Sequence, residues 1–452
     1  MHSPRSDPSR TGHPTSEIEV EALRFAQELI RIPSVSSRDP AAGGDGESEA
    51  ARYIKTLLED VGLAPMLFES APGRGNLVCR LRSDSDLPAL VVHAHLDVVP
   101  AAAEGWSVPP FAGRVQDGYL WGRGAADMKG MAAMMVAVAR DLARSSVAPH
   151  RDIILAFFAD EETGGRYGAH WMVENHPELF ADATEALSEI GGFTISLPTG
   201  RRVHLLATAE KGMAWATLRA TGTAGHASMP SADNAVCTLA GAVARIAQHR
   251  FPVVRSEPVD AFLSAMRAEM DWAEAEVGGD AATMVAALGS VGRVVDTALR
   301  NTATPTVFHG GHKENVIPRD AHAIVDCRLL PGSEEDFKAE FTSVVGAGVD
   351  VEWTISLPAV QAPLNGPLVE AIRRSVTGEC PDDIVAPYLV PAGTDNKHLS
   401  ALGIAGYGFT PLPVPADFDV LAQYHATDER IPVAALTTGT RLLRRIFLGG
   451  GS

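Results

Sequence analysis

The sequence of 452 residues contains few cysteines and no long uncharged apolar segment. Its four cysteines lie far apart in the sequence, which excludes a disulfide-dense scaffold and any Cys-x-x-Cys metal knuckle. No apolar run reaches the roughly 20 residues of a membrane-spanning helix, and residues 1–15 lack the apolar core of a secretory signal. We therefore expect a protein of the reducing cytoplasm, in which any metal site must use histidine and carboxylate ligands.

Positive charge is also scarce. The 38 Lys and Arg residues face 56 Asp and Glu residues, which leaves a formal net charge of −18. A surface this acidic repels phosphate backbones and anionic lipids, so the composition argues against nucleic acid and membrane surfaces as partners. The hydrophobic fraction of 46% is that of an ordinary globular protein, and the length favours about two or three domains.

The hydrophobic pattern predicts an α/β fold. Ser16 and Glu19 form a capping box that opens a helix over residues 16–31. Helical patterns over residues 49–60 and 131–143 alternate with apolar runs, which favours a layered domain with a mostly parallel sheet. The apolar runs, typical of strands buried on both faces, are Asn76–Leu81, Ala89–Ala94 and Ile153–Phe158.

The hydrophobic pattern of the sequence changes after about residue 208. Two alternating runs, 213–220 and 321–330, are each followed by a helical pattern, and this repeat predicts a small α+β domain inserted into the larger one. The predicted organisation is a disordered tail over residues 1–15, a larger domain over 16–208 and 358–452, and an inserted domain over 209–357 with a helical insertion at about 250–304.

Two histidines stand at the ends of predicted elements. His95 and Asp97, in V-V-H-A-H-L-D-V-V-P, leave the end of an apolar strand on the same face. A carboxylate is the usual partner that orients a metal-binding imidazole, although such a pair alone is more often a strand end with local hydrogen bonds. His425, in Y-H-A-T-D-E-R before the final helix, is on its own more often a structural histidine than a ligand.

Acidic residues gather at three further places. Asp127, in W-G-R-G-A-A-D-M-K-G, comes at the start of an apolar helix, where a capping carboxylate is also common. Residues 160–162, D-E-E, directly follow a buried strand, where adjacent acids repel unless cations or protons offset them; a solvated loop is the alternative. Glu189 is the one acid in the strand-like run A-L-S-E-I-G-G-F, and acids in such runs are rarely unpaired. The carboxyl ends of strands in open α/β sheets are where sites form.

Together these segments offer two histidines, at least three carboxylates and no thiol. That inventory suits two divalent ions that share a bridging carboxylate, with one acid left over to act as a base. The donor types favour Zn²⁺, with Co²⁺ or Mn²⁺ as substitutes, over copper or an iron–sulfur cluster.

Nine strings follow one another in a recognisable order from about residue 90 to residue 433: H-A-H-L-D-V-V-P, G-R-G-A-A-D-M-K-G, D-E-E-T-G-G, S-E-I-G-G, A-G-H-A-S-M-P, N-V-I-P, D-C-R-L-L-P-G, G-T-D and H-A-T-D-E-R. In this order they resemble the dizinc hydrolase family of aminoacylase-1, acetylornithine deacetylase, succinyl-diaminopimelate desuccinylase and the glutamate and Gly-X carboxypeptidases. The resemblance implies a zinc-peptidase-like three-layer catalytic domain and an inserted ferredoxin-like α+β lid that serves for dimerisation.

Residue by residue, the resemblance implies that Asp127 bridges two Zn²⁺ ions and that the peptide bond after it is cis. His95 and Glu189 would complete the protein ligands of one ion, and Glu162 and His425 those of the other.

The remaining roles follow from the same strings. The resemblance implies that Asp97 orients His95 and that Glu161 is the general base, which takes a proton from water and passes it to the leaving nitrogen. His226, in A-G-H-A-S-M-P, matches the histidine that stabilises the oxyanion; the alternative is a surface histidine in a polar turn.

Asn315, in N-V-I-P, and Arg328, in D-C-R, match residues that hold the terminal carboxylate of the substrate. The resemblance implies further substrate contacts from the backbone around Gly393 and Thr394. The planar fork of an arginine suits a carboxylate, although Arg328 alternatively pairs with a structural acid. A-G-T-D-N-K here replaces the commoner G-G-T-D-A-R, which leaves these contacts open.

The sequence therefore predicts a cytoplasmic, metal-dependent hydrolase that cleaves an amide bond next to a free carboxylate. Carboxypeptidase or dipeptidase action leads, and N-acyl-amino-acid deacylation is the alternative. A non-catalytic binding module is a further alternative, against which the presence of all five ligand positions and Glu161 argues. We expect small peptides or N-acyl amino acids as substrates and a homodimer formed through the lid. The insertion at about 250–304 either permits or replaces that dimer, and His226 acts either on its own site or on the partner's.

Overall fold

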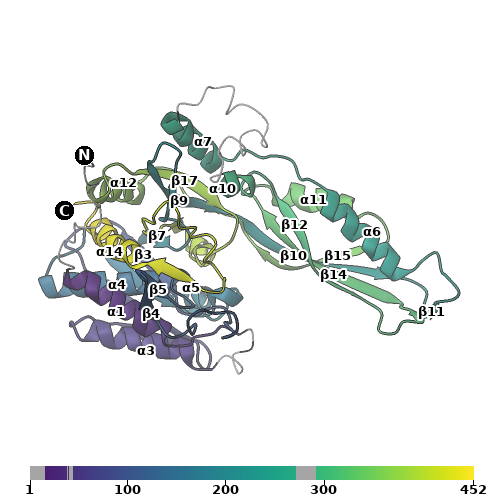
Figure 1. The fold of residues 1–452 in the computed structure, drawn as a ribbon, viewed down its shortest axis with the longest axis horizontal. Helices are drawn as coiled ribbons and strands as arrows, with labels where there is room; N and C mark the ends of the chain where they lie inside the picture. The colour runs from purple at the N-terminus through teal and green to yellow at the C-terminus, as the bar shows by residue number, and fades with distance from the viewer. Residues whose placement is uncertain (1–15, 38, 40–43, 271–291, 452) are drawn as a thin grey trace, which may run out of the picture. The chain divides into compact units, whose positions relative to one another are not determined.

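The computed structural model of the protein describes residues 16–37, 39, 44–270 and 292–451 (Figure 1). The chain forms two compact units. The first comprises residues 1–183, 370–381 and 410–452, and the second comprises residues 184–369 and 382–409. Within the described residues, no helix is both long and apolar enough to cross a membrane.

Four strands form the main sheet of the first unit, in the order β1 (Met66–Glu69), β2 (Gly75–Leu81), β6 (Ile153–Phe158) and β3 (Ala89–His95). β3 and β6 pair in parallel, and β2 and β1 extend the sheet antiparallel. Every residue of β3 and β6 is buried, as their lack of polar alternation predicted. The three predicted strands are thus confirmed within a residue or two of their predicted ends.

The α-helices of this unit include α1 (Glu17–Ile30), α3 (Gly46–Glu59), α4 (Lys129–Ser145), the short α5 (Ala169–Asn175), α12 (Pro367–Glu379, which begins in the second unit) and α14 (Val433–Phe447). The predicted capping box opens α1, because the backbone N–H of Ser16 donates to Oε2 of Glu19 at 3.0 Å. The apolar face of α1, which includes Phe25 and Leu29, is buried, and α1 packs against α4 and α14.

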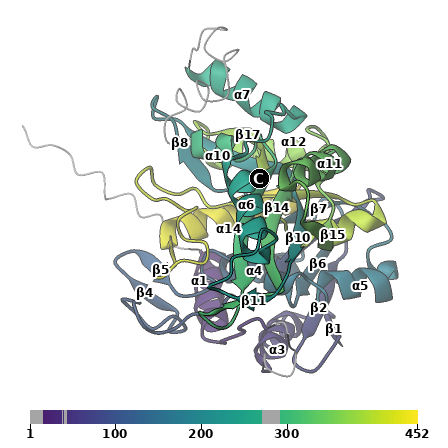
Figure 2. The ribbon, with the colours of Figure 1, turned by 90° about the vertical axis from the view of Figure 1, so that its right-hand side faces the viewer.

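A small sheet of the first unit joins segments that are far apart in the sequence. Its antiparallel strands are β19 (Arg430–Pro432), β5 (Tyr119–Trp121) and β4 (Arg114–Gln116), in this order. Arg430 pairs with Trp121, so the residues just before β19 lie beside those just after β5. Figure 2 shows this small sheet next to α14.

The second unit contains six strands of a mixed sheet: β7 (Ala183–Ser188, whose first residue belongs to the first unit), β8 (Thr194–Ser196), β9 (Arg202–Glu210), β16 (Val360–Gln361), β17 (Ile384–Val390) and β18 (Ala405–Gly408). β18 runs parallel to β7, and β17 runs parallel to β9. β8 and β16 join β9 antiparallel. Short helical segments follow β17: α13 (Asn396–Leu399) and a 3₁₀ turn, Ser400–Leu402.

The second unit also holds a separate antiparallel sheet, in the order β12 (Thr302–Gly310), β14 (Asp320–Leu329), β10 (Gly212–Thr221) and β15 (Asp350–Leu357). Its helices are α6 (Ala235–Gln248) and α11 (Glu334–Val345), and a short ladder joins β11 (Gly225–His226) to β13 (Val316–Ile317). Alternate residues of β10 and β14, such as Leu218 and Val325, pack with Leu239, Phe337 and Phe341 of the helices. The predicted small α+β domain is therefore present (Figure 1).

The predicted helical insertion falls partly outside the described residues. Its described parts form α7 (Glu257–Met270), which packs against β17, and α10 (Gly292–Asp296); residues 271–291 lie outside. The predicted fold class, an α/β fold with a separate small antiparallel lid sheet, is confirmed. The boundaries between catalytic and lid domains stay predictions.

Candidate metal centre

The Asp127 carboxylate lies between two imidazoles of the first unit. Nε2 of His95 is 3.0 Å from Oδ1 of Asp127, and Nε2 of His425 is 3.2 Å from Oδ2. His425 Nε2 is also 3.1 Å from Oε2 of Glu162. His95, Asp127 and Glu162 each offer a ligand atom, and these atoms lie within 4.8 Å of one another. One carboxylate whose two oxygens face different histidines is the arrangement that a bridge between two cations requires.

Local structure explains where each of these groups points. β3 ends at His95, whose Nδ1 lies 2.9 Å from the carbonyl oxygen and 3.5 Å from Oδ1 of Asp97, so that Nε2 faces Asp127. Asp127 itself comes two residues before α4, and its peptide bond to Met128 is cis, as the resemblance implied. His425 adopts a φ of 59° in the segment before β19.

Asp97 also holds the acidic turn after β6. Its Oδ1 accepts the backbone N–H of Glu161 at 3.0 Å, and its Oδ2 accepts that of Glu162 at 3.0 Å. These residues begin the 3₁₀ turn Glu161–Thr163, which Asp160 enters with a φ of 67°. A carboxylate oxygen of Glu161 lies within 4.8 Å of a ring nitrogen of His95. The predicted base and the predicted ligands of the first unit are therefore brought together.

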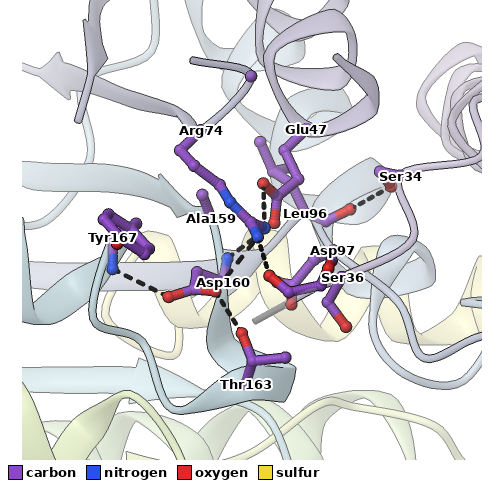
Figure 3. A network of polar contacts seen from close by, with 12 residues as sticks. Ser34, Ser36, Glu47, Arg74, Leu96, Asp97, Ala159, Asp160, Thr163 and Tyr167 are labelled. Atoms are coloured by element: carbon purple, nitrogen blue, oxygen red, sulfur yellow. Dashed lines mark hydrogen bonds and ion pairs between the residues drawn. The ribbon is translucent and has the colours of Figure 1, made fainter. Parts of the chain in front are cut away.

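A buried ionic network supports this turn (Figure 3). The Arg74 guanidinium, from the segment that leads into β2, points between two acids: Nη1 donates to Oε2 of Glu47 at 2.6 Å and lies 3.7 Å from Oδ1 of Asp160. Oε1 of Glu47 accepts the backbone N–H of Asp160 at 2.9 Å, and Oδ2 of Asp160 accepts that of Tyr167 at 2.9 Å. Asn76 accepts the N–H of Ala159 at 3.0 Å.

Sequence reasoning gave this network no role, apart from noting Asp160 in the acidic triplet. The one signal in the sequence is a pair of polar residues at the start of a predicted strand: Arg74 directly precedes β2, and Asn76 lies in it. In the structure the two residues are 1% and 0% exposed. Polar side chains this deeply buried need partners. The partner Glu47 is 27 residues from Arg74 in the sequence, and nothing in the sequence pairs them.

The charges of the site favour a cation between its carboxylates. Hydrogen bonds to Asp127 and Glu162 raise the pKa of His425 to about 10, despite the opposing effect of burial. Burial would raise the pKa of Asp127, but hydrogen bonds from His425 and His95 outweigh it and hold this pKa below its usual range. Burial raises the pKa of Glu162, and His425 offsets part of that rise. Imidazole and carboxylate donors without a thiolate suit Zn²⁺, Co²⁺ or Mn²⁺, so the residues present fit such ions.

Glu189 belongs to the second unit. It directly follows the last residue of β7 and is 4% exposed. The prediction that the strand-like run continues to Phe193 is wrong, because the chain turns away after Ser188: Ile190 has a φ of 55°, and two glycines with positive φ follow it. Glu189 thus stands directly beyond the end of β7.

The predicted residues of the lid lie in the second unit. His226, on β11, is exposed, and its Nδ1 lies 2.8 Å from the Ser228 hydroxyl. The Asn315 carbonyl accepts the N–H of Ala227 at 3.0 Å. Arg328 forms a fork with Asp326 on β14, with Nε–Oδ1 at 2.7 Å and Nη2–Oδ2 at 3.0 Å. The pairing with a structural acid that the sequence left open is therefore present.

The segment that differs from the family pattern is anchored internally. The Thr394 N–H and hydroxyl donate to the Glu210 carboxylate at 2.9 and 2.6 Å. Nζ of Lys397 donates to the carbonyl of Lys211 at 2.6 Å. A Cβ at Gly393 would lie 2.2 Å from Cε of Lys397, so a larger residue there would require the buried Lys397 side chain to shift. Substrate contacts by this backbone stay a prediction, since the Thr394 donors are directed at Glu210.

The fold and the cluster of imidazoles and carboxylates around Asp127 agree with a metal-dependent hydrolase. The chain belongs to peptidase family M20/M25/M40, whose sequence model matches residues 91–449. The predicted family and the prediction of a metallo-hydrolase enzyme are thereby confirmed.

Known relatives share most of the chain's length. It is 28% identical over 437 residues to the N-fatty-acyl-amino acid synthase/hydrolase PM20D1 of Mus musculus, covering 91% of this chain and 84% of that protein. It is 29% identical over 382 residues to the probable carboxypeptidase S-like 2 of Dictyostelium discoideum, covering 77% and 69%. Among solved structures, the metallo-carboxypeptidase Sso-CP2 of Sulfolobus solfataricus matches with a TM-score of 0.70 at 18% identity, over 95% of this chain and 99% of that one. The di-peptidase Dug1p of Saccharomyces cerevisiae matches with a TM-score of 0.71 at 14% identity, over 96% of each.

Proposed function

We propose that the protein hydrolyses an amide bond next to a free carboxylate, as a carboxypeptidase or dipeptidase. The observation that carries this proposal is the Asp127 carboxylate between His95 and His425, with Glu161 beside it. The carboxypeptidase S-like relative and the carboxypeptidase and dipeptidase structures support this type of substrate.

Asp127, with His95 and Glu189 on one side and Glu162 and His425 on the other, would hold two divalent ions, Zn²⁺ in the first instance. Bound there, such ions polarise the scissile carbonyl and lower the pKa of water. Chelation should abolish activity, and added Zn²⁺ or Co²⁺ should restore it. Full activity after the metal content has fallen below one ion per hundred chains would contradict the proposal.

Residues of the chain transfer the proton and bind the substrate. Glu161 accepts a proton from the attacking water and delivers it to the leaving nitrogen, and Asp97 fixes the turn from which Glu161 acts. His226 would stabilise the oxyanion, while Asn315 and Arg328 would bind the substrate carboxylate. Two donors of Arg328 already form hydrogen bonds with Asp326. Those donors can bind a substrate carboxylate in a bidentate manner only if the Asp326 side chain moves away.

A second candidate is the hydrolysis of N-acyl amino acids, which the PM20D1 relative favours because it matches 91% of this chain. A matched series of leucine compounds separates the two: Gly-Leu, N-blocked Gly-Leu, N-acetyl-Leu and N-lauroyl-Leu. A higher kcat/KM for N-acetyl-Leu or N-lauroyl-Leu than for both Gly-Leu compounds would establish the second candidate. Gly-Leu amide lacks the free carboxylate and should be a poor substrate in either case, so its efficient cleavage would overturn the shared part of the proposal.

We also propose a homodimer through the lid sheet and a cytoplasmic location. Sedimentation equilibrium tests the homodimer, because the chain has a mass of 47.7 kDa. A measured mass equal to that of one chain at micromolar concentration would contradict the dimer.

A further inference from the structure

Glu429 is a buried acid for which the proposed mechanism has no use. Its side chain is fully enclosed, with 0% exposure, and it accepts four hydrogen bonds from one loop. Oε2 accepts from Nη1 of Arg123 at 2.7 Å and from the N–H of Gly124 at 3.1 Å. Oε1 accepts from the N–H groups of Ala126 at 2.8 Å and Asp127 at 3.2 Å. A single carboxylate therefore shapes the loop that ends at the proposed bridging residue.

The same contacts reach the segment that carries His425. Nη2 of Arg123 donates to the His425 carbonyl at 3.2 Å, and the carbonyl of Glu429 accepts the N–H of Gly122 at 2.9 Å. The pairing of β5 with β19 puts both segments side by side, although they are about 300 residues apart in the sequence. Arg123 and Glu429 thus join the backbone before Asp127 to the backbone of His425.

The glycines of the loop 122–127 allow its backbone to close around the Glu429 carboxylate. Gly124 has a φ of 89°, and a Cβ there would lie 2.9 Å from Cγ1 of Val98. Converging backbone N–H groups form a small anion-binding concavity, and here the anion is supplied by the chain itself. Without it, three N–H groups and a guanidinium would lose their acceptor inside the protein, where unpaired donors are costly.

We propose that Glu429 is a positioning residue, which acts through Arg123 and the loop 122–127 to set the distances between the Asp127 oxygens and the imidazoles of His95 and His425. Through these distances it controls the affinity for the bridging ions. This inference rests on the proposed function for its metal-binding consequence, but its structural consequence does not depend on any metal.

Glu429→Gln tests the inference with an almost isosteric side chain. Its amide can accept at one oxygen only and turns an NH₂ group toward N–H donors. Glu21→Gln is the matched control: Glu21 is also buried, 6% exposed, and accepts from Arg140 and Arg144 of α4, but touches no proposed ligand. Glu429→Asp, which keeps the charge on a shorter stem, should lie between Glu429→Gln and the wild type.

The first measurement uses metal-free protein. Crystal structures of the chelated wild type and both glutamine variants should show the His425–Asp127 distance lengthened in Glu429→Gln and unchanged in Glu21→Gln. An unchanged distance in Glu429→Gln would overturn the inference, whether or not the protein binds metal. If Glu429→Gln does not fold, the same comparison is made with Arg123→Lys, which keeps a cation for Glu429 but loses the fork that reaches His425.

The second measurement is Zn²⁺ affinity by competition with a chelator. We expect Glu429→Gln to weaken it about 10–100-fold, as loss of groups that orient ligands commonly does, while Glu21→Gln stays within twofold of the wild type. Equal losses in both variants would show general destabilisation and overturn the positioning role. A wild type that binds no Zn²⁺, Co²⁺ or Mn²⁺ would instead refute the proposed function and leave the distance measurement to decide the inference.

Discussion

The backbone N–H of Glu161 donates to Oδ1 of Asp97 at 3.0 Å. Because the carbonyl of the same Asp97 lies 2.9 Å from Nδ1 of His95, one residue fixes the proposed base relative to a proposed ligand. Asp97 is 0% exposed, so water does not compete for its oxygens. This residue thus links the end of β3 to the turn after β6 through hydrogen bonds.

Replacing Asp97 with asparagine should therefore disturb the base and the ligand together. The asparagine amide can accept from only one of the two N–H groups of the turn and presents an NH₂ group to the other. We expect kcat/KM to fall about 10–100-fold, with weaker metal binding measured by chelator competition. Asp117→Asn, at an exposed turn of the same unit, is the control and should change neither. Wild-type kinetics in Asp97→Asn would show that the turn holds its place without this acceptor.

Glu161→Gln isolates the proton transfer. The glutamine has nearly the same shape but cannot take a proton, so kcat should fall by several orders of magnitude while the protein keeps about two ions per chain by elemental analysis. Glu174→Gln, at an exposed glutamate of α5, should be silent in both measurements. If Glu161→Gln retained more than a tenth of the wild-type kcat, another group would have to be the base.

Much of the architecture follows from local sequence signals. The uninterrupted apolar runs of β3 and β6 predict strands buried on both faces, and the capping box at Ser16 predicts the start of α1. The lid core follows from alternation in β10 and β14. The string motifs also point to His95, Asp127, Glu162 and His425, and the structure brings these side chains together. Their roles as ligands follow from the family resemblance and stay predictions.

The supporting contacts could not be predicted in this way. Arg74 meets Glu47 only because α3 lies against β2, and Glu429 meets Asp127 only through the register of β5 with β19. Neither relationship has a fixed spacing in the sequence. The partner of Arg328 was left open for a different reason: Asp326 is two residues away on the same strand face, and sequence alone does not choose between it and a ligand.

The Arg74 network predicts a large stability effect. Arg74→Met leaves the buried Glu47 without its cation, and breaking a buried pair from one side costs about 3–5 kcal/mol. Arg82→Met is the control, because Arg82 pairs with Asp152 at 3.0 Å but its side chain is 76% exposed; its loss should cost less than about 1 kcal/mol. The double variant Glu47→Gln/Arg74→Met should recover part of the loss. Equal urea midpoints for Arg74→Met and Arg82→Met would contradict the buried-pair account.

Lys211 predicts a pH dependence of stability in the second unit. Burial, assisted by the charge of Arg328, lowers its pKa to about 8 from 10.5, against the opposing charge of Asp296. Between these values the unfolded chain holds a proton that the folded chain has lost, so wild-type stability rises with pH across this window. Below about pH 8 Lys211 is protonated in both the folded and the unfolded chain. Burial of its ammonium group then lowers the free energy of unfolding by its full amount.

Lys211→Met removes this cost at every pH. Its stability relative to the wild type should therefore fall by about 3 kcal/mol between pH 8 and pH 10.5, since one pH unit between the two pKa values corresponds to about 1.4 kcal/mol. Urea unfolding across this range measures the change. Lys338→Met, on α11, removes a lysine whose side chain is 26% exposed and pairs with Glu334, and it controls for the loss of one positive charge. A constant difference between Lys211→Met and the wild type would mean that Lys211 stays protonated in the fold, held by the carbonyl of Arg300 to which its Nζ donates.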